Sequence, residues 1–426
     1  MGGALKRTIM LFLVAILLTG CWDRREPEEL VPVLALGFDM DEEGFYEVVA
    51  QLSNPSAIGG GGAGGDPTGG TAGGGRGTKR TFWTHSVKGH TPFEAIRNLA
   101  LTTTRLISLS HLEFLLLSEK LARHGIGPII DLFERERQLR LSVHVAIVEG
   151  DLKELLDAEF PLEMTAAMGL SRLFRLLRAE RSVITEGPLL AKIVLLERPG
   201  EEMTLPRVKL LQSEGPNRSK GSSPSPSPVT SPGPPAEVSG GAAFRGEKMV
   251  GWLDIREARG WNWITGRGQR GPILVKTPGV EGLVTIDLLG AKSTVEPVVE
   301  GDRIRMRVKV KAWGRVQDQT TPEGDGRTLD LRDPEAIRSL RRRFSAVLRN
   351  DMEMAIARAQ ELGSDIFGFG NAVYRKHPRV WKEFAAERWD EIFKTIPVDI
   401  TVETVVVRPG LVLSSTTAPR GPREGE

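Results

Sequence analysis

The stretch from Asp333 to Gly363, DPEAIRSLRRRFSAVLRNDMEMAIARAQELG, decides how the last folded part of the chain is built. Asp333 is a favoured N-cap residue, Pro334 suits the first helical position, and Gly363 is a stop signal. Between them, apolar side chains recur near one face: Ile337, Leu340, Phe344, Val347, Leu348, Met352, Ala355, Ala359 and Leu362. This spacing predicts an amphipathic helix of about 29 residues.

The segments on either side of this helix predict the fold class. A second amphipathic helix and then an alternating strand are expected after it, and strands are expected before it. The second helix is lined by Trp381, Phe384, Ala385, Trp389 and Ile392, and the strand by Val398, Ile400, Val402 and Val406. The earlier strands are Leu283–Leu289, Arg303–Trp313 and a hairpin of Ala242–Phe244 with Met249–Leu253, followed by a helix capped by Asp254 and Glu257. This order is not a Rossmann array, and it predicts an α+β fold with largely antiparallel sheets.

The N-terminal half shows a similar mixture of helices and strands. Strands are expected at Phe45–Leu52 and Leu112–Leu117, and a half-buried alternating strand at Leu139–Ile147. Helices are expected after Thr91, where Pro92 and Glu94 complete a capping box, over Gly127–Arg137, and after Asp151, which is followed by Glu154.

The composition of the 426-residue chain is that of a globular protein, with 40% hydrophobic and 26% charged residues. A single cysteine excludes a disulfide framework and a cysteine-based zinc site. The six histidines are scattered, and a net charge of +2 argues against a general nucleic-acid binder. We therefore expect no metal, no cofactor and no nucleic-acid partner.

The N-terminus has the form of a lipoprotein signal peptide. Lys6 and Arg7 precede the apolar run Thr8–Leu18, which spans about 16 Å as a helix, against about 30 Å of bilayer hydrocarbon. Leu18-Thr19-Gly20-Cys21 then matches a bacterial lipobox. We expect cleavage after residue 20 and a diacylglyceryl group on Cys21, whose two acyl chains give stable anchoring. The alternative is an uncleaved anchor or a chance cysteine.

Low-complexity stretches divide the remaining chain. Ser56–Gly77 is glycine-rich, Ser213–Gly241 is rich in Pro, Ser and Gly, and the tail Ser414–Glu426 consists almost entirely of Ser, Thr, Pro, Gly and charged residues. Neither of the first two can bury enough apolar surface to offset its ordering entropy, so we expect a floppy loop at the first and a stiffer, extended segment at the second. The tail is expected to be disordered. The expected order is an N-terminal domain at 21–212 with a glycine-rich loop, a linker at 213–241, a strand-rich middle domain at 242–320 and a C-terminal domain at 325–413.

Catalytic motifs are missing from the sequence. No HExxH, GxSxG or CxxC occurs, and the glycine-rich stretch lacks the strand-to-helix context of a nucleotide site. Two basic clusters are interpreted as solvated faces, the first paired with acids such as Glu281 and Asp287; docking to a protein partner or to lipid headgroups is the alternative. The clusters are Arg303, Arg305, Arg307, Lys309 and Lys311, and Arg338, Arg341, Arg342, Arg343 and Arg349. His111 and His144 are interpreted as structural, and Trp252, Trp261 and Trp263 as packing residues.

Several separated motifs resemble the Ger(x)C family of spore germination lipoproteins, the C subunits of nutrient germinant receptors. They occur in the family's order over nearly the whole mature chain, and the two low-complexity stretches look like insertions. The motifs are Trp22-Asp23-Arg24-Arg25-Glu26 after the lipobox, Gly37-Phe38-Asp39, Gly89–Arg97, Ser110-His111-Leu112, Phe244–Leu253, Asp365–Gly370, Tyr374–Pro378 and Trp381.

The resemblance implies a non-catalytic lipoprotein of three α+β domains on the outer face of the spore inner membrane. The resemblance also implies that the protein acts together with the integral membrane A and B subunits of the same receptor, in receptor assembly and signal transduction. It implies Cys21 as the site of lipid attachment. The alternatives are a lipid-anchored solute-binding protein, which calls for two α/β lobes, and a lipoprotein hydrolase, against which the missing nucleophile and base motifs argue.

Overall fold

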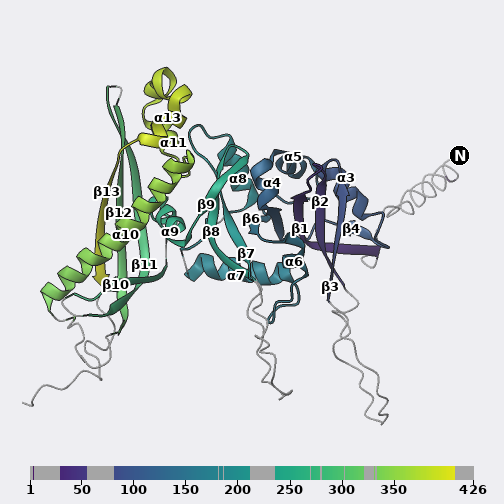
Figure 1. Cartoon of the computed structure of the whole chain (residues 1–426), viewed down its shortest axis with the longest axis horizontal. Helices are drawn as coiled ribbons and strands as arrows, with labels where there is room; N and C mark the ends of the chain where they lie inside the picture. Colours follow the sequence, from purple (N-terminus) through teal and green to yellow (C-terminus); the bar gives the residue numbers. More distant parts are fainter. Residues whose placement is uncertain are drawn as a thin grey trace, which may run out of the picture.

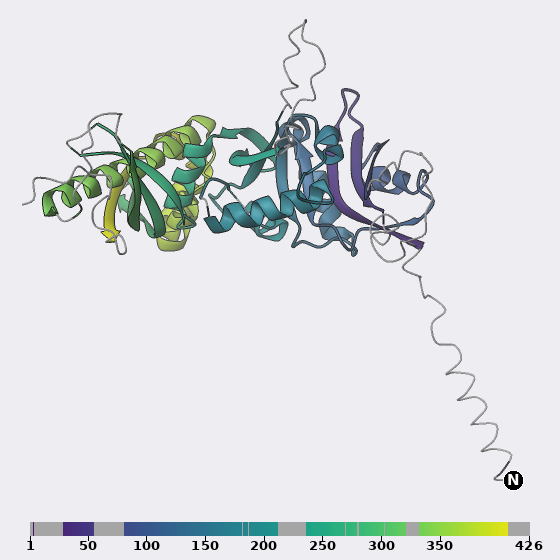
Figure 2. The ribbon, with the colours of Figure 1, turned by 90° about the horizontal axis from the view of Figure 1, so that it is seen from below.

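The computed structural model describes Gly3 and residues 29–54, 81–211, 236–320 and 331–407, with gaps at 181, 186, 269, 279–280, 302 and 332. Cys21, the glycine-rich stretch, residues 213–235 of the expected linker and the tail lie outside the described residues. The described part is α+β, as predicted, and its two sheets lie side by side along the long axis of the molecule (Figures 1 and 2).

The larger sheet has nine strands in the order β3-β2-β1-β5-β6-β7-β8-β9, with β4 beside the start of β1. Its centre is parallel, from β1 through β5 and β6 to β7, and its outer strands are antiparallel. The strands are β1 (Leu30–Met40), β2 (Tyr46–Ser53), β3 (Phe82–Gly89), β4 (Leu106–Ser108), β5 (Phe114–Ser118), β6 (His144–Glu149), β7 (Thr204–Leu210), β8 (Ala236–Arg245) and β9 (Lys248–Leu253).

Because the centre of this sheet is parallel, the sheets contain more parallel strand pairs than the largely antiparallel arrangement expected from the sequence. Burial on both faces explains the difference: β5 is buried along its whole length, which is typical of a parallel strand between two helical layers. The half-buried strand predicted at Leu139–Ile147 is wrong for the same reason. The strand found, β6, starts at His144, and its four central residues are all buried.

Helices cover both faces of this sheet. On one face α3 (Pro92–Leu99), α4 (Glu119–His124), α5 (Gly127–Arg135) and α8 (Leu189–Leu196) share a core with Leu36 and Phe38 of β1. On the other, α6 (Leu152–Asp157) and α7 (Ala166–Glu180) pack against Ala35 and Phe114. The predicted N-caps are confirmed, because the side chains of Thr91 and Asp151 accept from the N–H groups of Glu94 and Glu154. The capping box predicted at Thr91 is not completed, since the Glu94 carboxylate accepts from the His90 N–H instead.

Both low-complexity stretches are bracketed by paired strand ends. Ser53 of β2 pairs with Phe82 of β3 across the glycine-rich stretch. Leu210 of β7 pairs with Ala236 of β8 across the Pro-rich one. The last residues of the expected linker therefore belong to β8, because Ala236 and Val238 are buried against β7. The hairpin of β8 and β9, which turns at Gly246, extends the same sheet.

The smaller sheet has the order β10-β11-β12-β13 and consists of β10 (Gly271–Lys276), β11 (Leu283–Glu300), β12 (Arg303–Thr320) and β13 (Val398–Val407). The long helix predicted at 333–363 is confirmed as α10 (Pro334–Leu362), with Asp333 as N-cap and Gly363 left-handed at its end. It crosses one face of this sheet diagonally (Figure 1). Strand β13 returns after α10 to pair in parallel with β12.

The second amphipathic helix predicted around Trp381 is broken into short pieces. They are α11 (Phe369–Lys376), α12 (Pro378–Val380), a π-helical turn at Trp381–Ala385, a 3-10 turn at Ala386–Arg388 and α13 (Trp389–Thr395). The predicted apolar residues still face the core, because Trp381, Ala385 and Trp389 are buried. The change of helical pitch keeps both tryptophans on the inner side, with their ring centroids 5.5 Å apart.

Helix α9 (Ile255–Ile264) packs closely against α10 at one glycine. A Cβ added to Gly260 would lie 2.1 Å from the carbonyl oxygen of Asp351, which no relaxed contact allows. The Asp351 side chain is fully buried and accepts from Arg259 (2.6 Å) and Arg256 (3.1 Å) of α9. Close backbone approach and a paired buried carboxylate therefore fix α9 on α10.

This contact predicts that Gly260→Ala destabilises the chain by about 1–3 kcal/mol, because the added methyl group overpacks the α9–α10 interface. Urea unfolding followed by circular dichroism measures the change. Glu353→Ala, on the exposed side of α10, is the matched control and should stay within about 0.5 kcal/mol. Equal unfolding midpoints for Gly260→Ala and the unaltered chain would contradict the packing described.

Candidate functional site

The two sheets are connected by a joint, which consists of residues Gly200–Glu202 on one side and Ser364–Asn371 on the other. Backbone hydrogen bonds cross it in both directions: the Glu202 N–H donates to the Asp365 carbonyl (2.9 Å), and the Asn371 N–H donates to the Gly200 carbonyl (3.1 Å). The Ser364 hydroxyl also donates to the carbonyl of Phe244 in β8. The two sides of the joint are therefore held together by hydrogen bonds, and the joint is not a loose linker.

Two glycines make this close approach possible. Gly200 has a φ of +62°, and a Cβ there would lie 2.7 Å from the Cα of Gly370 and 2.6 Å from the ring of Trp381. A Cβ on Gly370 would meet Trp389 at 2.6 Å. Any side chain at either glycine would force the two halves apart.

Asp365 organises the C-terminal side of the joint. Its carboxylate is buried and accepts from the N–H groups of Phe369 (3.0 Å) and Gly370 (2.7 Å) and from the indole N–H of Trp389 (3.0 Å). Burial raises the pKa of Asp365 to about 7, and the three donors oppose this shift by favouring the ionised form. The carboxyl group therefore holds the start of α11 and the position of Trp389 together.

Other contacts stiffen the joint. The indole N–H of Trp261 donates to the Ile366 carbonyl (2.7 Å), which ties α9 to the same loop. The Asn262 amide donates to the Ile184 carbonyl (2.9 Å), and Arg358 of α10 donates to the Trp252 carbonyl in β9 (3.2 Å). A displacement of one sheet is consequently transmitted to the other through bonded contacts.

The tryptophans proposed as packing residues take that role. Trp261 and Trp263 are buried in the core of the smaller sheet. Trp252 is half-buried, with the Arg207 guanidinium 5.5 Å from its ring. Of the two histidines, His144 stacks on Phe114 at 5.3 Å, whereas His111 is exposed.

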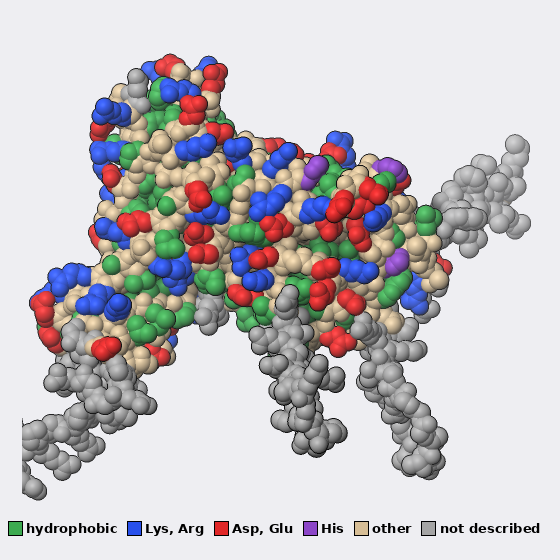
Figure 3. Space-filling model, viewed as in Figure 1, with side chains coloured by type: hydrophobic (Ala, Val, Ile, Leu, Met, Phe, Trp, Pro, Cys, Tyr) green, Lys and Arg blue, Asp and Glu red, His purple; other side chains and the backbone are tan. Residues whose placement is uncertain are grey.

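Arg303, Lys309 and Lys311 of the basic strand face are exposed, and Arg305 is ion-paired, though with other acids than predicted. Arg305 contacts Glu300 (2.8 Å) and Asp399 (3.8 Å), while Asp287 pairs with Arg315 (3.3 Å). On the face shown in Figure 3, acidic and basic side chains are interspersed.

Three of the five residues in the basic cluster of α10 make local contacts. Arg338 and Arg342 share the carboxylate of Glu335. Arg341 donates to the Thr404 carbonyl (2.8 Å) and so joins α10 to β13. These pairings favour the solvated interpretation of the helix cluster.

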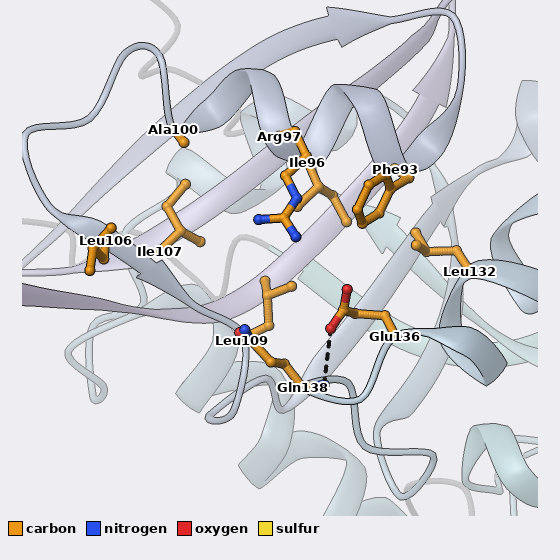
Figure 4. A pocket seen from close by; sticks show the side chains of 10 residues that line it. All are labelled: Phe93, Ile96, Arg97, Ala100, Leu106, Ile107, Leu109, Leu132, Glu136 and Gln138. Carbon is orange, nitrogen blue, oxygen red and sulfur yellow. Dashed lines mark hydrogen bonds between the residues drawn. The ribbon is translucent and has the colours of Figure 1, made fainter. Parts of the chain in front are cut away.

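A small cavity of about 120 Å³ lies at the far end of the larger sheet, between α3, β4 and α5 (Figure 4). Its lining is mostly apolar, and the guanidinium of Arg97 lies over the Phe93 ring, 4.9 Å from its centroid. Glu136 lines the other side, where its carboxylate accepts from the Gln138 N–H (3.2 Å). A shallower depression beside α5 shares Phe93, Leu132 and Glu136 with it.

The described residues contain no cluster of three or more His, Cys, Asp or Glu side chains placed to hold a metal ion. None of their helices combines the length and the apolar character needed to cross a bilayer.

Comparison with known proteins places the chain in a family. Residues 23–210 match the family described as "Spore germination protein N-terminal domain", and residues 239–410 match "Spore germination B3/ GerAC like, C-terminal". This chain belongs to the Ger(x)C family. Its joint connects the two matched regions, since Gly200–Glu202 lies in the first and Asp365 in the second.

Full-length relatives support this assignment. The chain is 22% identical to spore germination protein KC of Bacillus subtilis, covering 95% of both chains. It is 22% identical to spore germination protein B3 of the same organism, over 96% of this chain and 99% of the relative, and 20% identical to GerQC of Bacillus cereus. The crystal structure of the GerBC protein has the same fold, with a TM-score of 0.50 at 17% identity over 87% of this chain and 96% of that one.

The joint of this Ger(x)C protein was not predicted from the sequence. Asp365–Gly370 was a family motif without a structural role, and Gly200 had no assigned role. The available signal was an acid directly before the apolar and glycine-rich run IFGFG (Ile366–Gly370), where a carboxylate needs backbone donors. The partner segment at Gly200 carries no comparable signal, because close approach of two backbones depends on the tertiary fold.

The raised pKa of Asp365 predicts a pH-dependent role in stability. Between about pH 4 and pH 7 the folded chain keeps a proton on this carboxyl that the unfolded chain releases, so its contribution to the free energy of unfolding falls as pH rises through this window. Asp365→Asn places an amide N–H₂ against donor groups and should destabilise by about 1–3 kcal/mol at pH 5. We expect a smaller loss at pH 8.

Urea unfolding of both proteins at the two pH values measures this difference. Glu387→Gln, an exposed change in the same segment, should leave both free energies within about 0.5 kcal/mol. A loss that is identical at pH 5 and pH 8 would show that Asp365 does not titrate in this window.

Proposed function

We propose that this chain is the lipid-anchored C subunit of a spore nutrient germinant receptor. The observation that carries the proposal is the match of both germination regions in one chain, together with relatives that it covers over nearly their whole length. Their printed names are those of spore germination proteins. The lipobox at Cys21 supplies the anchor, and the membrane is the spore inner membrane, with the folded chain on its outer face.

The chain acts by contact and not by catalysis. It assembles with the integral membrane A and B subunits and couples nutrient recognition to their response. Coupling requires an element whose contacts differ between the resting and the triggered receptor. Such a change at one sheet would reach the other through the joint, because backbone bonds, two glycines and the Asp365 carboxylate connect the two sheets there.

The solute-binding alternative fits this geometry less well. A binding protein of two lobes holds its ligand in the cleft between them. Here the Gly200 and Gly370 backbones meet so closely that not even a methyl group fits between them. Nothing in the hydrogen bonding of the joint points to a solute.

The anchor is tested by Cys21→Ala. The substitution removes the thiol that would receive the diacylglyceryl group, so incorporation of radiolabelled palmitate should be lost and the signal peptide should remain attached. Labelling and mass spectrometry of the membrane fraction measure both effects. Normal maturation and labelling of Cys21→Ala would exclude the lipoprotein assignment.

The receptor role is tested by gene deletion in a spore-former that has this receptor alone. Germination in response to nutrients should be abolished, because the membrane subunits lack their partner. Germination by a cationic surfactant or by external calcium dipicolinate should persist, since neither agent acts through the receptor. A deletion that spares the nutrient response, or a purified chain that hydrolyses a peptide or peptidoglycan, would refute the assignment.

A further inference from the structure

Four large apolar side chains are exposed at the end of the larger sheet opposite the joint. We name Trp83, Phe93, Leu101 and Leu106 the β4 patch; between 45% and 83% of the accessible surface of each is exposed. Phe93 and Leu106 line the same cavity (Figure 4). Space-filling Figure 3 shows hydrophobic side chains at the surface of this end of the molecule.

Hydrogen bonds and ring contacts fix the rest of the patch. Leu101 follows the last turn of α3, and its neighbour Thr102 makes a 2.7 Å hydrogen bond with His85. His85 in turn stacks on Trp83, with ring centroids 4.7 Å apart. Trp83 on the edge strand β3 is thereby held beside the loop that leads from α3 to Leu106.

The first described strand, β1, begins at this patch. Leu30, the first residue of β1, pairs directly with Leu106 of β4. Cys21 is nine residues upstream, and nine residues span at most about 32 Å even when fully extended. If Cys21 is acylated, as the proposed function requires, Leu30 cannot lie farther than this from the bilayer surface, and Leu106 of the β4 patch is paired with Leu30.

The chemistry of the patch fits a lipid surface. Tryptophan and other aromatic residues are enriched at membrane–water interfaces, and arginine side chains there extend their charged ends toward the headgroups. Arg97 covers the Phe93 ring, and Arg105 is exposed next to Leu106. Nearby acids have partners of their own: Glu94 accepts from the His90 N–H (2.7 Å), and Glu136 accepts from Gln138.

We propose that the β4 patch inserts into the interface of the bilayer that holds Cys21. The acyl anchor and the patch then give two points of attachment, which fix the orientation of the chain on the membrane. Because α3 and β4 lie at one end of the molecule and β12 and α10 at the other, the long axis points away from the bilayer (Figure 1). The joint lies between the two ends.

The single cysteine of the chain offers a direct test. In the lipidated protein the Cys21 sulfur is blocked, so Leu101→Cys introduces one free thiol for a nitrobenzoxadiazole probe. Leu274→Cys, an exposed leucine on β10 of the smaller sheet, is the matched control. Both labelled full-length proteins are reconstituted in vesicles of phosphatidylglycerol and phosphatidylethanolamine, with and without nitroxide-labelled lipid.

We expect the nitroxide lipid to quench about half or more of the fluorescence at Leu101→Cys and to leave Leu274→Cys nearly unchanged, since insertion reaches roughly 5–10 Å into the headgroup–acyl boundary. Flotation with the vesicles reports the anchor separately. Absence of quenching at Leu101→Cys in a chain that floats overturns the patch and leaves the anchor intact. The proposal is also overturned if the environment of the Leu101 probe changes only after the membrane subunits are added. In that case a protein partner, and not the bilayer, covers the patch. A chain that does not float overturns both assignments.

Discussion

The Asp365 carboxylate is buried where the two sheets meet, and it is satisfied only while Phe369, Gly370 and Trp389 keep their positions. Burying a carboxyl without partners is expensive, so these donors must be in place whenever the chain is folded. The same loop provides the backbone groups that bond Gly200 and Glu202. The placement of α11, the broken helical segment after it and the contact between the two sheets thus all depend on one buried acid.

Local sequence signals predicted the elements whose stability is local. The cap residues Thr91, Asp151, Asp254 and Asp333 begin helices as expected, and α10 has the predicted length and buried face. The hairpin at Gly246 and the α+β class could also be predicted from the sequence, because turn type and apolar periodicity depend on residues that are close together in the chain. The Ger(x)C motifs then supplied the family.

Non-local structure was harder to predict. The parallel centre of the large sheet depends on which strands become neighbours, and the short apolar run of β5 does not reveal this. The segment around Trp381 keeps a helical pattern of apolar residues, yet it changes pitch to pack both tryptophans against one core. Predicting the joint would mean pairing two segments that are separated by more than 160 residues, and the presence of glycine at position 200 does not indicate which segment it contacts.

The contacts between the two sheets join the described residues into one body. The smaller sheet is held on the larger one by α9, α10 and the joint, and Leu106 of the β4 patch pairs with Leu30 at the start of β1. A subunit that works by contact benefits from such stiffness, because a movement imposed at one end reaches the other without being absorbed by a flexible linker.

The strand pairs that bracket the low-complexity stretches have an evolutionary consequence. Ser53 with Phe82, and Leu210 with Ala236, are held by antiparallel neighbours in the sheet, so the register of both pairs is independent of the number of residues between them. If the two stretches are disordered, as the sequence predicts, doubling the length of either costs only about 0.6 kcal/mol of closure entropy. Replication errors that add glycine or proline codons in these two stretches therefore lengthen the protein with little effect on its stability. At Gly200 and Gly370, in contrast, even the addition of a Cβ is not tolerated.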